Sequence, residues 1–312
     1  MNGRAVVLAA VAAAIMLGGS AGHATPLPNA PGCTIFPADN PWNTPVDTLP
    51  VAANSAAMIR AIGRTTPVHP DFGSGRWDGG PIGIPFDVVT SATRTHRVRF
   101  SYADDSDHVR YPIPSTVHIE GGPRSTGDRH ALLVNKTTCR LYELYDLHHT
   151  SRGWKAGSGA TWSLSSNKLR PAGWTSADAA GLPILPGLVR WDEVASGAID
   201  HALRFTAPAT RRAYVYPARH FASNSTSASL PPMGLRVRLK PGVDLTKFPN
   251  QARVVLRALQ VYGMILADNG SPWYVSGAPN AHWSNDALHA LSQLTGADFE
   301  VVDTSSLPEP GK

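Results

Sequence analysis

The sequence predicts a mainly β protein, an antiparallel two-sheet sandwich of the jelly-roll type with a few packed helices. First, 28 Gly and 27 Pro divide the 312 residues into many short segments. Such division is typical of sandwiches and barrels rather than of helical bundles. Second, several segments alternate apolar and polar side chains with the period of two that a β-strand requires. Third, only residues 250–262 place apolar side chains convincingly at helical spacing.

The expected strands form two clear hairpins and a third pair. The segment 131–134 returns through 139–146, and 264–267 returns through 273–276 by way of Asn269-Gly270, which supplies the positive φ angles of a tight turn. In chain order the predicted strands are 97–102, 131–134, 139–146, 199–206, 213–216, 235–240, 264–267, 273–276 and 299–302, with 199–206 paired to 213–216.

Helices are expected over 54–64, 250–262 and 286–294. The middle one is the best supported, with Asn250 expected to cap its start and Gly263 to end it in the left-handed conformation.

The N-terminus has the three parts of a secretory signal peptide. Arg4 precedes an apolar run over 5–17, and Gly22-His23-Ala24 supplies small residues at the cleavage site. We expect cleavage after Ala24, so that residues 1–24 are removed and 25–312 form one exported, extracytoplasmic domain. The apolar run is shorter than the ~20 residues of a membrane-spanning helix, and no other stretch reaches that length.

The two cysteines are expected to form a disulfide. Cys33 and Cys139 both remain after cleavage, and an even pair in an oxidising compartment usually closes. By the chain-entropy model, this loop would contribute about 4 to 5 kcal/mol, an upper figure. A catalytic thiol is the alternative.

Charge and motifs exclude several classes of function. The formal net charge is +5 from 28 basic and 23 acidic residues, and no Lys/Arg cluster marks a nucleic-acid interface. Neither a glycine-rich nucleotide-binding motif nor His-Glu-x-x-His zinc spacing occurs. We therefore expect no nucleic acid, cofactor or metal.

The first candidate catalytic group lies on the predicted hairpin. Asp128 and His130 fall at a strand mouth, and Glu143 follows on the next strand beside an aromatic residue. A half-buried carboxyl group of this kind acquires a raised pKa, and two carboxyl groups are the minimum for glycoside hydrolysis. A turn ion pair of Asp128 with Arg129, or a metal site formed by His118, Asp128 and His130, are alternatives.

Further candidates come from the middle of the chain. Asp178 lies in the Pro- and Gly-rich segment 164–190, which forms either a cleft wall or a loop packed on the core, where Asp178 would cap a helical turn. His201 lies on an apolar strand face, where a core histidine is the alternative to an acid or base, and Arg204 lies on the opposite face. In a lyase, His130 or His201 would remove a sugar proton while Arg204 neutralises a uronate carboxylate.

Substrate binding is assigned to basic and aromatic side chains. Arg236, Arg238 and Lys240 share one strand face, either as a solvent-exposed surface or as a floor for an anionic polysaccharide. Eight Trp residues occur, several in predicted loops, where their rings either hold sugars or anchor loops to the core. Trp174 and Trp273 are the two assigned to binding.

Four segments resemble a group of secreted bacterial proteins that has no settled activity. They are CTIFPADNPWN (33–43), SADAAGLP (176–183), HALRFT (201–206) and YGMILADNG (262–270). The resemblance extends over nearly all of 25–312. It implies export and a single intact domain, and it transfers no catalytic residues.

The hypothesis is a secreted carbohydrate-active enzyme, a glycoside hydrolase or polysaccharide lyase acting on an extracellular or cell-wall glycan. The alternative is a non-catalytic protein that binds glycans at a cell surface. An enzyme requires at least two of the polar candidates within one cleft, whereas a binding protein requires only an aromatic platform.

Overall fold

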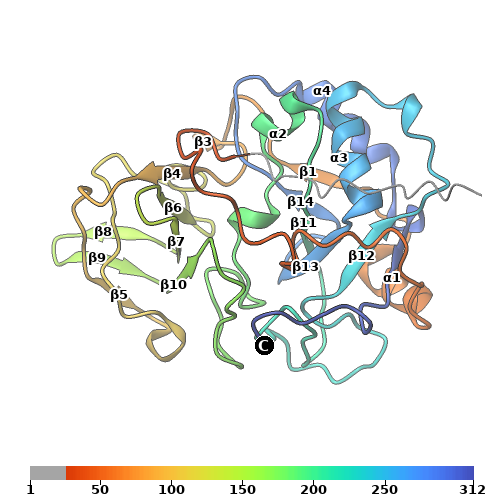
Figure 1. Ribbon diagram of the computed structural model, residues 1–312, viewed down its shortest axis with the longest axis horizontal. Helices are drawn as coiled ribbons and strands as arrows, with labels where there is room; N and C mark the ends of the chain where they lie inside the picture. The colour runs from red at the N-terminus through yellow and green to blue at the C-terminus, as the bar shows by residue number, and fades with distance from the viewer. Residues whose placement is uncertain (1–25) are drawn as a thin grey trace, which may run out of the picture.

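The computed structural model describes residues 26–312. The predicted signal peptide, residues 1–24, lies outside the described residues. Two lobes stand side by side, one built on a six-stranded sheet with helices packed around it and the other on two smaller sheets (Figure 1).

The helices are α1 (Ser55–Gly63), α2 (Trp191–Ser196), α3 (Asn250–Val261) and α4 (Asn285–His289), with 3₁₀ turns η1 (Ala103–Asp105), η2 (Leu185–Gly187), η3 (Leu245–Lys247), η4 (Ala290–Gln293) and η5 (Gly296–Asp298). The strands are β1 (His69–Asp71), β2 (Arg76–Trp77), β3 (Gly80–Pro81), β4 (Phe86–Val89), β5 (Val98–Phe100), β6 (Ala131–Asn135), β7 (Arg140–Tyr145), β8 (His148–Thr150), β9 (Gly153–Ala156), β10 (Ser158–Ser163), β11 (Leu203–Ala207), β12 (Arg236–Leu239), β13 (Met264–Asn269), β14 (Tyr274–Ser276) and β15 (Phe299–Val301).

The six-stranded sheet has the order β1-β14-β11-β13-β12-β15. Its β1–β14 and β11–β13 pairs are parallel, and the other pairs are antiparallel. All five residues of β11 are buried, which suits a central strand covered on both faces. The mainly β class is confirmed. The purely antiparallel jelly-roll sandwich is not confirmed, because this sheet is mixed.

The predicted hairpin over 264–276 is wrong. Strands β13 and β14 do form at these positions, but β11 lies between them and pairs with both. The segment 213–216 forms no strand beyond an isolated bridge of Tyr214 to Met233, so its predicted pairing with 199–206 is also wrong.

The second lobe contains the hairpin that the sequence predicted correctly. Strands β6 and β7 pair antiparallel, from Ala131 opposite Leu144 to Asn135 opposite Arg140. Strands β10 and β4 complete this four-stranded sheet, and β5, β9 and β8 form a separate three-stranded one. Leu132 and Val134 of β6 join the apolar core that extends through the six-stranded sheet, so the lobes share a core.

The long helix forms as predicted over Asn250–Val261, and Gly263 follows it with φ 65°. The Gly263 amide donates to the Ala258 carbonyl oxygen, which closes the helix end. The cap differs: Pro249 occupies that position, and Asn250 instead accepts a hydrogen bond from Arg253.

The disulfide Cys33–Cys139 is present, and it joins the N-terminal segment to the turn between β6 and β7. In the part of the chain that the structure describes, none of the helices has the length and apolar character to cross a membrane.

Candidate functional site

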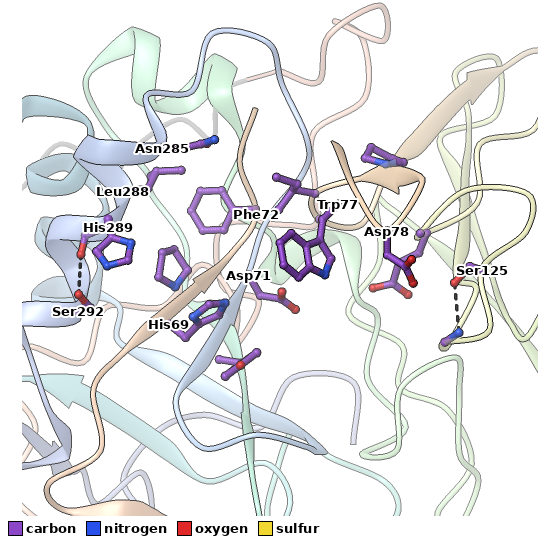
Figure 2. A pocket seen from close by; sticks show the side chains of 18 of the residues that line it. His69, Asp71, Phe72, Trp77, Asp78, Ser125, Asn285, Leu288, His289 and Ser292 are labelled. Carbon is purple, nitrogen blue, oxygen red and sulfur yellow. Dashed lines mark hydrogen bonds between the residues drawn. The ribbon is translucent and has the colours of Figure 1, made fainter. Parts of the chain in front are cut away.

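A cleft of about 750 Å³ lies where the two lobes meet. Strand β1 forms its floor, α4 and η4 one side, and the β2–β3 hairpin with the loop 120–127 the other (Figure 2). A smaller cavity of about 160 Å³ adjoins it, and Asp71, Glu120 and Tyr274 line both. The volume of the larger cleft, about 750 Å³, is typical of sites for small ligands.

Aromatic rings line the wide part of the cleft. Trp77 of β2 is 78% exposed, the largest exposure among the large apolar side chains that the structure describes. His69 and Tyr274 stack with ring centroids 4.1 Å apart. In Figure 2, Trp77 and Asp78 lie on the hairpin side of the cleft, and His289 lies on the opposite side.

Two glycines fix the hairpin against the turn that carries Glu120. A Cβ atom at Gly80 would lie 2.0 Å from the carbonyl carbon of Gly121, so only a glycine allows the two backbones to approach this closely. Gly121 itself has φ 68°, in the left-handed region. The wall bearing Trp77 is thereby held next to the carboxyl group of Glu120.

Glu120 and His130 form a tight pair where the two cavities join. Nδ1 of His130 lies 2.6 Å from Oε2 of Glu120, and Nε2 lies 2.9 Å from the carbonyl oxygen of Ala177. Burial alone would lower the pKa of His130, but the charge and hydrogen bond of Glu120 outweigh it and raise that pKa to about 9. In return, although burial opposes it, His130 lowers the pKa of Glu120. At neutral pH, Glu120 is therefore ionised and His130 protonated.

Asp71, at the end of β1, has a pKa that is shifted in the opposite direction from that of Glu120. Solvent in the cleft reaches this residue, but the surrounding walls partly desolvate its carboxyl group. That desolvation, followed by the negative charge of Glu120, raises the pKa of Asp71. Two carboxyl groups at the junction of the cavities are thus driven toward different protonation states.

A buried ion pair lies behind them. Nε and Nη2 of Arg204 each lie 2.7 Å from an oxygen of Asp178, and Nη1 donates to Oγ of Ser276 at 2.6 Å. Asp268 lies 3.7 Å from Nη2 of Arg204. Burial, and then the charge and hydrogen bond of Asp178, raise the pKa of Asp268 to about 8 despite Arg204.

Glu120, Asp128 and His130 lie close enough together to suggest a metal site. Ligand atoms of Glu120, Asp128 and His130 are all within 4.8 Å of one another. Both ring nitrogens of His130 are already hydrogen-bonded, and its raised pKa keeps the ring cationic, which opposes a cation. His118, which the alternative metal site would have used as a ligand, instead pairs with Asp87 at 2.6 Å and lines a different cavity. The residues present therefore fit a metal ion poorly.

Of the six predicted catalytic residues, Asp128, His130 and Arg204 line the smaller cavity, and Asp178 lies directly behind it through Arg204. Glu143 is fully buried and accepts hydrogen bonds from the Ile184 and Leu185 amides.

Burial raises the pKa of Glu143 to about 7, against the effect of these amides. His201 lies outside the cluster: its ring bonds the Ala202 carbonyl oxygen at 2.8 Å and the Glu193 carboxylate at 3.1 Å. Its predicted alternative, a satisfied core histidine, describes this placement.

The predicted binding residues lie away from the cleft. Arg236 is 5% exposed and donates to the carbonyl oxygens of Tyr262, Pro41 and Thr44, so the expected open basic face on β12 is wrong. Lys240 is exposed and bonds the Ala297 carbonyl oxygen.

Trp273 is fully buried between Phe205 and Phe299, where no sugar reaches its ring. Trp174 is half-buried with its ring against Arg170, and it lines neither cavity of the site.

Asp71, Glu120, Asp268 and Trp77 were missed as site residues. Asp71 belongs to a three-residue strand, too short for any periodicity to register. Asp268 was assigned to a hairpin turn, and Trp77 was one of eight Trp residues without a distinguishing pattern. The run Trp77-Asp78-Gly79-Gly80, in a segment with five Gly residues between 73 and 83, was the available indication of a functional loop.

Comparisons with protein-family models, with curated proteins and with solved structures found no match.

Proposed function

We propose that this protein is a secreted glycoside hydrolase that cleaves an extracellular or cell-wall glycan in the cleft between its lobes. The observation that carries the proposal is the pair of carboxyl groups where the two cavities join: the pKa of Asp71 is raised and that of Glu120 is lowered. Environments that separate two carboxyl groups in this way supply the acid and the base of glycoside hydrolysis.

In the proposed reaction, Asp71 donates its proton to the glycosidic oxygen as the bond to the anomeric carbon breaks. Glu120 supplies the electron pair, either by attacking the anomeric carbon itself or by removing a proton from the attacking water. After water has added, one new hydroxyl group stands on each sugar. Where Glu120 is the nucleophile, Asp71 regains its proton from the attacking water; where Glu120 is the base, it releases that proton to solvent and Asp71 takes one up from solvent.

His130 is a positioning residue for Glu120. Its protonated ring, anchored on the carbonyl oxygen of Ala177, keeps the Glu120 carboxylate ionised and oriented. Arg204, Asp178 and Asp268 supply a fixed polar wall behind the pair. Such rigid support is what a catalytic constellation needs to retain its geometry.

The lyase mechanism has less support in this geometry. His130 is bonded at both nitrogens and protonated, so it has no free electron pair with which to remove a sugar proton. His201 is buried away from the cleft. Arg204 already shares its charge with Asp178, so it is not free to neutralise a uronate carboxylate.

Export is part of the proposal. The disulfide Cys33–Cys139 forms in an oxidising compartment, and the lack of a membrane-spanning helix among the described residues is compatible with a soluble extracytoplasmic protein. The predicted cleavage after Ala24 supplies the route.

The test incubates residues 25–312 with a panel of neutral, amino-sugar and uronate polysaccharides and follows both reducing ends and unsaturated uronate products. We expect reducing ends from the wild type, and a loss of roughly 10²-fold or more in rate for Asp71→Asn and for Glu120→Gln. Asp104→Asn, at an exposed acid that lines neither cavity, is the matched control.

The pH profile adds an independent check. Activity should fall as pH rises through the raised pKa of Asp71 and as pH falls through the lowered pKa of Glu120. Hydrolysis that both variants retain would refute the assignment. Retention of glycans with no turnover anywhere on the panel would refute the enzyme and establish the alternative, a glycan-binding protein.

A further inference from the structure

The charge of the cleft is opposite to that of the whole chain. The chain has a formal net charge of +5, yet the residues that line the cleft include the carboxylates of Asp78 and Glu120 and neither Lys nor Arg. His69, on the floor, has a pKa that burial lowers, so it supplies no compensating positive charge at neutral pH. A concave site lined by one sign of charge concentrates ligands of the other sign.

Asp78 is the acid that the proposed chemistry does not use. It lies beside the exposed Trp77 on the hairpin side of the cleft, away from the smaller cavity (Figure 2). Its backbone has φ 46° and that of Gly79 has φ 83°, the positive angles of a two-residue Asp-Gly hairpin turn, so the turn places this carboxylate at the cleft rim. An aromatic ring with a carboxylate beside it matches a sugar ring that bears a positive substituent.

We infer that the cleft binds a cationic glycan, a polymer of amino sugars with free amino groups. A sugar ring lies on the face of Trp77, and protonated amino groups pair with the carboxylates of Asp78 and Glu120. A uronate polymer would meet like charge at each of these positions, whereas a neutral glycan would leave the rim carboxylate without a partner. The inference rests on the proposed function for the assignment of a glycan to this cleft, but its test measures binding and does not depend on turnover.

The experiment compares three oligosaccharides of equal length by calorimetry: glucosamine, N-acetylglucosamine and galacturonate hexamers. All titrations are done at about pH 5.5 in the Asp71→Asn background, which prevents hydrolysis of the ligand and leaves the carboxylates of Asp78 and Glu120 in place. We expect the glucosamine hexamer to bind about tenfold more tightly than its acetylated counterpart, with the ratio shrinking as salt is added. The galacturonate hexamer should bind most weakly.

Two substitutions separate charge from stacking. Asp78→Asn should reduce the preference for free over acetylated amino groups about fivefold, as expected for one exposed ion pair, while Asp104→Asn leaves it unchanged. Trp77→Ala should weaken both glucosamine-type hexamers by a similar factor of about ten or more. Tyr102→Ala is its matched control, since Tyr102 is 57% exposed and lines neither cavity.

The inference is overturned if the acetylated or galacturonate hexamer binds as tightly as the glucosamine hexamer, or if Asp78→Asn leaves the preference intact. Failure of the proposed function has a different signature. Tight, Asp78-dependent binding of the glucosamine hexamer without hydrolysis by the wild type would refute the hydrolase alone. Hydrolysis that shows no preference for free amino groups would refute this inference alone.

Discussion

The buried ion pair of Arg204 with Asp178 is predicted to set both the stability of the site and the protonation of Asp268. The Asp178 side chain is fully buried and the Arg204 side chain is 6% exposed, with two contacts of 2.7 Å between them. Replacing Asp178 by Asn keeps the shape but removes the charge. The guanidinium then remains buried with Asp268, 3.7 Å away, as its nearest carboxylate.

Breaking one partner of a buried ion pair costs about 3 to 5 kcal/mol, because the other charge is left uncompensated. Since Asp268 can ionise in response and supply part of the missing charge, we expect Asp178→Asn to cost about 3 kcal/mol, the lower end of that range. The assay is urea unfolding with the disulfide intact. In the double variant Asp178→Asn with Arg204→Met, the loss should be smaller than the sum of the two single losses, because neither charge remains buried alone.

The same substitution should lower the pKa of Asp268 from about 8, because Asp178 is what raises it after burial. Carboxyl-carbon NMR of the wild type and the variant measures this directly. Glu193→Gln, which breaks a second buried network with Arg190 and His201, is the control: it should also destabilise the protein but leave the pKa of Asp268 unchanged. Additive single effects, together with an unaltered pKa of Asp268, would refute the coupling.

Two further predictions concern the whole molecule. The free energy of unfolding should fall as pH rises: the pKa of Glu143 is raised from 4.5 to about 7 and that of His130 from 6.5 to about 9, so each group contributes stability below its unfolded pKa that is lost as pH rises through its folded pKa. Each of the two groups contributes about 3 kcal/mol. Urea unfolding of Glu143→Gln should show a free energy of unfolding that changes less between pH 4.5 and about pH 7, the ordinary and the folded pKa of Glu143, than it does in the wild type. An equal change with pH in the two proteins would contradict the assignment. Reducing Cys33–Cys139, which closes a loop with a sequence separation of 106, should lower the free energy of unfolding by up to about 4 to 5 kcal/mol, and equal urea midpoints before and after reduction would contradict it.

The parts of the fold that the sequence predicted correctly are those in which neighbours in the chain are also neighbours in space. Helix α3 buries side chains at the helical spacing that its own residues show, and the β6–β7 hairpin joins two strands that are adjacent in the chain. Gly263 marks the helix end because the left-handed conformation there depends on that residue alone. Such local features need no knowledge of the rest of the molecule.

The face of β12 shows why other predictions failed. Alternation correctly placed Arg236 and Arg238 on one side of the strand, but it carries no information about what covers that side. The N-terminal segment lies there, and its carbonyl oxygens at Pro41, Thr44 and Val46 accept from the two guanidinium groups. A surface that alternation assigns to solvent is therefore interior, and burial lowers the pKa of Arg236 to about 9.

The placement of β11 between β13 and β14, which made the hairpin prediction wrong, also assembles the site. Asn269-Gly270 indicated a tight return from β13 to β14, but β11, from some sixty residues earlier, separates them. That insertion puts Arg204 between Asp268 of β13 and Ser276 of β14, and the guanidinium contacts both. Strand β1 then pairs with the far side of β14 and brings Asp71 to the same edge. Had β13 and β14 paired directly, Arg204 would have been displaced from between them, and the buried charge that holds Asp178 and Asp268 together would be absent. The chemistry of the cleft therefore depends on a pairing between distant segments that local pattern in the sequence does not encode.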